Sequence, residues 1–133
     1  MNLRNLRLGI DLVLHHDLIW TDEHSWSPVV QTVEHTLNGA IAIDVAKRQA
    51  GRPISLSSPR DDMAWHTRAT VDALAIWAAM PGETFDLTLD DGRKFTVIFR
   101  HQEAPVIESK PVRGHASYEA DDFWQVKLKF MEI

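Results

Sequence analysis

The feature that most constrains the fold is an alternation of apolar and polar residues, which is clearest at the end of the chain. The apolar residues there are Trp124, Val126, Leu128 and Phe130, separated by Gln125, Lys127 and Lys129. A repeat of two is typical of a β-strand with one buried face, because successive side chains point to opposite sides. The segment 6–14 has apolar residues on its even positions, so we predict strands at both ends of the chain.

The segment 29–45 keeps its apolar residues on odd positions, before and after the dipeptide Asn38-Gly39. That dipeptide is typical of a two-residue hairpin turn. Such a turn would place Leu37 and Ile41 on opposite faces, since directly opposed residues share a face. One long strand, bent or bulged at Gly39, preserves the parity, and we prefer this interpretation over a hairpin.

The middle of the chain predicts one helix, at about residues 67–80. Thr67 is a suitable N-cap, and Pro81-Gly82 ends the segment. Its apolar surface is wide, so we expect the helix to pack on a sheet. The apolar residues that recur at helical spacing are Val71, Leu74, Ala75 and Ala78.

The segment 85–99 is the clearest hairpin. A three-residue loop at 90–92 opposes Leu87 to Phe95 and puts Gly92 at the left-handed position of the turn. Short strands are also expected around Ile54 and in the segment 106–112.

These elements add up to about six strands and one helix, with the helix in the middle of the chain. This order is not a repeating βαβ pattern. We therefore expect an α+β, mainly β fold: an antiparallel β-sandwich or barrel-like sheet with one flanking helix. A length of 133 residues indicates a single domain over 1–133.

Composition excludes several classes of protein. The chain has no cysteine, which excludes disulfides, thiol nucleophiles and thiolate zinc sites. Residues 1–60 carry 6 basic and 6 acidic groups, whereas residues 61–133 carry 8 and 13, which accounts for the net charge of −5. Without a basic stripe we expect no sequence-specific binding of nucleic acid.

No membrane or targeting segment is expected either. The longest apolar run, 73–80, is far shorter than the roughly 20 residues that span a bilayer. The stretch after the first residues is interrupted by Asp11 and has no small-residue cleavage site. We expect a soluble protein that is made in a cytoplasm.

Catalytic motifs are absent from the local sequence, and no glycine-rich phosphate loop can be built from it. The seven histidines include His15 and His16, which on a strand would point to opposite faces and could not hold one metal together. A metal site assembled in space from His15, His24, His35 and Glu34 remains an alternative that spacing does not encode. We predict neither catalytic residues nor a cofactor or metal.

Tryptophans in irregular segments are the remaining candidates for a function. Trp20, Trp26 and Trp65 can pack loops onto the core, or they can anchor a contact with another protein. Together with Asp22 and Pro28, which share the first irregular segment, they form our candidate protein–protein interface.

The order of several short motifs resembles that of small tail and baseplate proteins of tailed bacteriophages and prophages. These motifs are the segment 20–29, the segments 36–40 and 51–56, the helix, Pro81-Gly82 with the hairpin to His101, Pro111-Val112 and the final strand. The chain also looks like the wider tail-tube and distal-tail group. The resemblance covers nearly the whole chain, but each motif is short and turn-like.

The resemblance implies a β-sandwich with one helix that assembles into rings, a structural role and no catalytic residues. It places the protein in the virion tail, near the junction of tail tube and baseplate, with other tail proteins and further copies of itself as partners. A ring of six copies is one arrangement, and an acidic lumen would let DNA pass without binding. The alternatives are a small metal-dependent enzyme that uses histidines and an acid, and a ligand-binding β-barrel lined by Trp20, Trp26 and Trp65.

Overall fold

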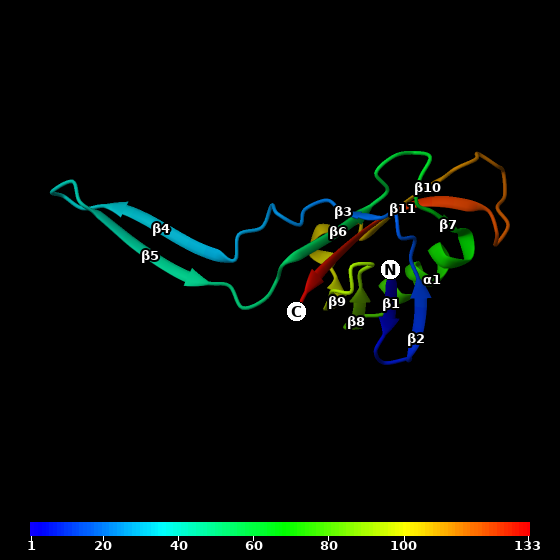
Figure 1. The fold of residues 1–133 in the computed structure, drawn as a ribbon, viewed down its shortest axis with the longest axis horizontal. Coiled ribbons are helices and arrows are strands. Elements are labelled where there is room, and N and C mark those ends of the chain that lie inside the picture. Colours follow the sequence, from blue (N-terminus) through cyan, green and yellow to red (C-terminus); the bar gives the residue numbers. More distant parts are fainter.

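The computed structural model describes residues 1–133 and shows a mainly β fold with antiparallel pairing throughout and a single α-helix (Figure 1). This confirms the predicted fold class, although the strands are more numerous than six. The strands are β1 (Asn2–Asn5), β2 (Ile10–Val13), β3 (Ile19–Trp20), β4 (Val29–His35), β5 (Ile41–Lys47), β6 (Pro53–Ser57), β7 (Trp65–Thr67), β8 (Phe85–Thr88), β9 (Lys94–Phe99), β10 (Ile107–Pro111) and β11 (Phe123–Glu132). The helix α1 spans Arg68–Ala78, and a short 3-10 helix spans His101–Glu103.

The ten-residue strand β11 is the centre of the main sheet. Along the sheet the order is β2-β1-β8-β9-β11-β6-β3, and β7 and β10 also pair with β11. Near the start of β11 lie β7 and β10, and near its end lie β6 and β9. Val126, Leu128 and Phe130 are buried, so the alternation predicted for this strand is confirmed.

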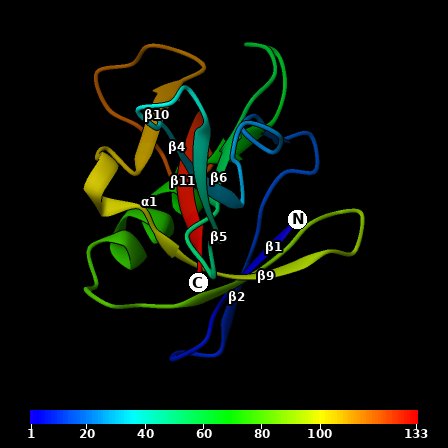
Figure 2. The ribbon, with the colours of Figure 1, turned by 90° about the vertical axis from the view of Figure 1, so that its left-hand side faces the viewer.

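The helix α1 covers one end of the sheet, where it contacts β7, β10 and β11. Thr67 caps it as predicted, since its hydroxyl accepts a hydrogen bond from the amide of Thr70. A row of aromatic rings joins the helix to the sheet: Trp77 stacks on Phe85, and Phe85 meets Phe99, which contacts Phe130. Figure 2 shows α1 to one side of the strands.

The segment 6–14 is not one strand, which corrects the prediction from its alternation. Residues 2–13 form a hairpin of β1 and β2, with a turn at 6–9. The Asn5 carboxamide oxygen accepts hydrogen bonds from the amides of Arg7 and Leu8, and Gly9 has a φ of 67°. An Asx turn followed by a left-handed glycine therefore interrupts the alternation.

The segment 29–45 is also different from the prediction, because it is a hairpin and not one bent strand. The strands β4 and β5 pair from Val29 with Lys47 to His35 with Ile41. The loop holds three residues, 37–39, closed by a hydrogen bond from the amide of Thr36 to the carbonyl of Ala40. A three-residue loop keeps odd positions opposite odd positions, so it gives the parity that seemed to require a single strand.

The hairpin of β8 and β9 agrees with the prediction in its register and its loop. Phe85 lies opposite Val97 and Leu87 opposite Phe95, and the amide of Leu89 donates to the carbonyl of Arg93. The strands predicted around Ile54 and at 106–112 are present as β6 and β10. The structure contains no helix with the length and hydropathy that a membrane span requires.

Candidate assembly surface

The hairpin β4–β5, called the arm from here on (residues 29–47), projects away from the rest of the molecule (Figure 1). Its two strands form a sheet of their own, and every residue from Val29 to Lys47 is exposed. None of the 18 residues of the hydrophobic core comes from the arm. The arm is thus an extension of the body and not a part of its core.

One face of the arm is apolar although nothing covers it. The odd positions of both strands point to this face, which we call the odd face. Leu37 at the tip is fully exposed, and Val45 is 61% exposed. The other large apolar residues of the odd face, each about half exposed, are Val29, Val33, Ile41 and Ile43.

Such an arm is poorly explained as a free element in water. A lone two-stranded hairpin is only marginally stable, and it needs a further layer or strand to persist. Both outer edges of the arm are unpaired, and unpaired edges are templates for other strands. Contiguous exposed apolar surface of this kind marks an interaction site.

The segment that leads into the arm is fixed to the body through Asp22. Its carboxylate accepts hydrogen bonds from the Ser55 amide at 2.9 Å and the Ser55 hydroxyl at 2.8 Å. The guanidinium of Arg100, which is buried, donates to the same hydroxyl and lies 3.8 Å from the carboxylate. Asp22 therefore sets the position at which the chain leaves the body.

Trp20 fixes the same segment through contacts of its own. Its ring lies against Phe95, edge to face, with the guanidinium groups of Arg52 and Arg93 over it at 4.5 and 5.5 Å. Its indole nitrogen donates to the carbonyl of Pro53. Trp20 is thus engaged in packing within this chain.

Arg93 extends this anchor to the loop before the arm. Its guanidinium donates to Glu23 at 2.6 Å and to Asp91 at 2.7 Å. The hydrogen bond from Arg93 lowers the pKa of Glu23, and the amide and guanidinium of Arg93 lower that of Asp91. These groups remain charged at neutral pH and hold the loop before the arm to the hairpin of β8 and β9.

The other predicted interface residues do not form one patch with these. Trp26 and Pro28 lie at the base of the arm, where Arg48 lies over the Trp26 ring and its amide donates to the carbonyl of Pro28. Trp65 lies on β7, at the opposite end of the molecule, against Phe123 (Figure 1). The structure therefore divides the candidate interface into an arm base and a separate site.

His15 and His16 lie side by side, which corrects the expectation that they point to opposite faces. They belong to a turn after β2, where backbone alternation does not apply, and their rings stack at 4.5 Å. With Asp17 they form the one cluster of three metal-ligating side chains in the chain. His24, His35 and Glu34 do not join it, so the predicted set is not assembled.

His66 is hydrogen-bonded to this turn. Its Nε2 accepts a hydrogen bond from the amide of His15 at 2.9 Å, and its Nδ1 lies 3.2 Å from the carbonyl of Ala64. This pattern requires a neutral ring with the proton on Nδ1. Burial lowers the pKa of His66 to about 4, so the ring stays neutral over the physiological range.

Neither the sequence nor the fold identifies a relative. No family model or curated protein matches the sequence, and no solved structure matches the fold. Function must therefore be inferred from the residues and surfaces of this chain.

The apolar residues of the arm were missed as functional candidates, although their signal is in the sequence. Val33, Ile43 and Val45 share a parity, which indicates one common face but not what covers that face. Two apolar strands joined by a short loop, with polar irregular segments on either side, are also compatible with a projecting arm. Only the structure shows that these strands form a projecting arm and that their apolar face is not covered by the core of the same chain.

Proposed function

We propose that this chain is a structural subunit of the tail of a bacteriophage or prophage, part of a ring near the junction of tail tube and baseplate. The projecting arm carries the proposal, because an uncovered apolar hairpin is suited to an assembly and has little use in a free enzyme. The ordered motifs that resemble tail proteins supply the setting. The partners are then further copies of this chain and other tail proteins, with a ring of six as one arrangement.

The charge of the chain is compatible with this proposal. The acidic excess lies after residue 60, and several of these acids stand in exposed turns, among them Asp61, Asp62 and Asp91. An acidic wall repels phosphate, so DNA would pass such a ring without being held.

Deletion of the gene from the phage or prophage genome that carries it tests the proposal. The expected result is a population of particles with missing or incomplete tails, restored by the gene supplied on a plasmid. A matched complementation with the arm removed should fail, whereas the variant Ile76→Asp, on the exposed side of α1, should restore tails. Normal infectious tails in the deletion strain would contradict the proposal.

A second candidate, metal binding at the turn 15–17, rests on the gathered side chains of His15, His16 and Asp17. Nitrogen and carboxylate ligands suit zinc, and three ligands leave room for water. Metal analysis of untagged protein after incubation with zinc tests it. One equivalent of zinc that is lost in His16→Ala would support the candidate; no retained zinc and a melting temperature unchanged by chelator would remove it.

A further inference from the structure

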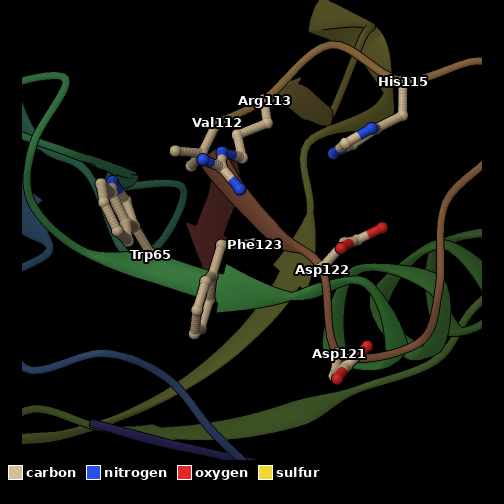
Figure 3. Close-up of a pocket in the computed structure, with 7 residues that line it drawn as sticks. All are labelled: Trp65, Val112, Arg113, His115, Asp121, Asp122 and Phe123. Carbon is tan, nitrogen blue, oxygen red and sulfur yellow. The ribbon is translucent and has the colours of Figure 1, made fainter.

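The end of the molecule opposite the arm carries a hollow of about 440 Å³ (Figure 3). Trp65 from β7 and Phe123 from β11 form its apolar wall, together with Val112. The two rings lie 5.7 Å apart, and the side chains of Trp65 and Phe123 are 38% and 50% exposed. Two large aromatic rings left open to water at a concave site are typical anchors of a protein contact.

The arm carries a feature that fits this hollow. Leu37 stands at the tip with its whole side chain in solvent, and the odd face continues from it along both strands. The volume of the hollow is large enough for a branched apolar side chain and part of the turn that carries it.

The two features lie at opposite ends of the longest axis of the molecule, so they cannot meet within one chain (Figure 1). Contacts between one patch and a different patch on an identical neighbour are head-to-tail, and they generate closed rings or filaments. The same chain thus offers both halves of a repeating contact.

We infer that the arm docks on a second copy of this chain, with Leu37 in the hollow lined by Trp65 and Phe123. The inference deepens the proposed function, since it names the contact that would build the ring. It also separates Trp65 from Trp20: the indole nitrogen of Trp65 donates to the carbonyl of Asp61, but its ring stays open to solvent, whereas the ring of Trp20 is packed inside its own chain.

One hydrogen-bonding match accompanies the apolar contact. The odd face has no acidic side chain, and His35, two residues before Leu37, is able to donate a hydrogen bond to a carboxylate at the hollow. The hollow is lined by the carboxylates of Asp121 and Asp122 and also by Arg113 and His115, so its border carries polar groups of both signs. The acids of the arm, Glu34 and Asp44, lie on its other face and would avoid these carboxylates.

The size of the arm is adequate for a specific contact. Seven residues at about 3.3 Å each make a strand roughly 23 Å long, so the odd face extends past the hollow onto the neighbouring surface. Six large apolar residues, half or fully exposed, bring the area buried on both partners to the order of the ~1,200 Å² at which stable interfaces begin.

Sedimentation velocity of the purified chain over a range of concentrations tests the inference. The wild type should associate, and Leu37→Asp and Trp65→Ala should each weaken association by at least about tenfold. Ile76→Asp, an equally drastic change of an exposed apolar residue on α1, should associate like the wild type. Melting curves establish that each variant is folded, and Phe123→Ala takes the place of Trp65→Ala if the latter is not.

A mixture of the two defective variants makes the test specific. Leu37→Asp retains an intact hollow and Trp65→Ala retains an intact arm, so together they have one working contact. The expected product is a 1:1 heterodimer that does not grow further. A contact between two arms predicts instead that Trp65→Ala associates like the wild type and that the mixture forms nothing new.

Two results would overturn the inference. One is a Trp65→Ala variant that associates like the wild type, and the other is a wild type that stays monomeric at its highest soluble concentration. The proposed function would then be unaffected, because deletion of the gene tests the tail role without reference to the contact surface. Conversely, association through arm and hollow combined with normal tails in the deletion strain would refute the tail role alone.

Discussion

Asp22 joins the body to the arm through groups that are largely withdrawn from water. Its carboxylate accepts from the amide and hydroxyl of Ser55, and the buried Arg100 shares that hydroxyl. Arg100 also donates to the carbonyl of Phe130, in the central strand. The network therefore ties the start of the arm to β6 and β11 at once.

Asp22→Ala should lower the free energy of unfolding by about 2 kcal/mol, since it removes two hydrogen bonds to a charged group and leaves Arg100 short of a partner. Urea titration followed by circular dichroism measures the change. Asp11→Ala is the matched control, because Asp11 forms only an exposed ion pair with Arg4, and it should cost less than about 0.5 kcal/mol. Equal losses in the two variants would argue against the network.

The lowered pKa of His66 predicts that the free energy of unfolding decreases as the pH falls. Its pKa is about 4 in the folded protein and near 6.5 when unfolded, so the unfolded chain binds the proton more readily. Stability from this residue is complete above pH 6.5 and is lost as the pH falls toward 4, by up to about 3 kcal/mol. Urea titrations at a series of pH values should show that His66→Gln has a flatter profile over this window. Parallel profiles would contradict the assignment.

The sequence could not predict how the side chains of His15 and His16 lie relative to each other. His15 and His16 stack in the turn after β2, where the amide of His15 donates to His66, a residue 51 positions further along the chain. Alternation describes side chains only while the backbone remains extended.

At the scale of elements, the two hairpins show what could be predicted and what could not. The loop at 90–92 carried Asp and Gly at the positions that a three-residue turn requires, so its register was correct. The same loop length explains the arm. The Asn38-Gly39 pair is typical of a two-residue turn, which conflicts with the parity of the strands, and this conflict favoured one bent strand over a hairpin. The prediction of a single strand over 6–14 was wrong because the Asn5 side chain stabilises a turn inside a pattern that alternates like a strand.

Removal of the arm should leave the body folded. Its contacts of any extent are those between its own two strands, and it contributes nothing to the core. Replacing residues 29–47 by a short Gly-Ser turn should change the melting temperature by less than about 4 °C, equivalent to under about 1 kcal/mol. A drop of more than about 10 °C in calorimetry would show that the arm supports the body.

At the scale of the whole molecule, the hydrophobic core lies apart from the two surfaces that we propose for assembly. One end of the long axis is the arm, the other is the hollow beside Trp65, and the core lies between them (Figure 1). Sequence patterns predicted the fold class and most of the central strands, since these depend on local periodicity. They could not predict the distance between the two surfaces, which follows from the arrangement of the sheet.

The central claim, that this chain is a subunit of a phage or prophage tail, is tested most directly by cryo-electron microscopy of tailed particles from cells that carry its gene. We predict density for a ring of copies at the junction of tail tube and baseplate, in which each arm lies on the neighbouring copy. A complete tail whose density is fully accounted for by other chains would contradict the account.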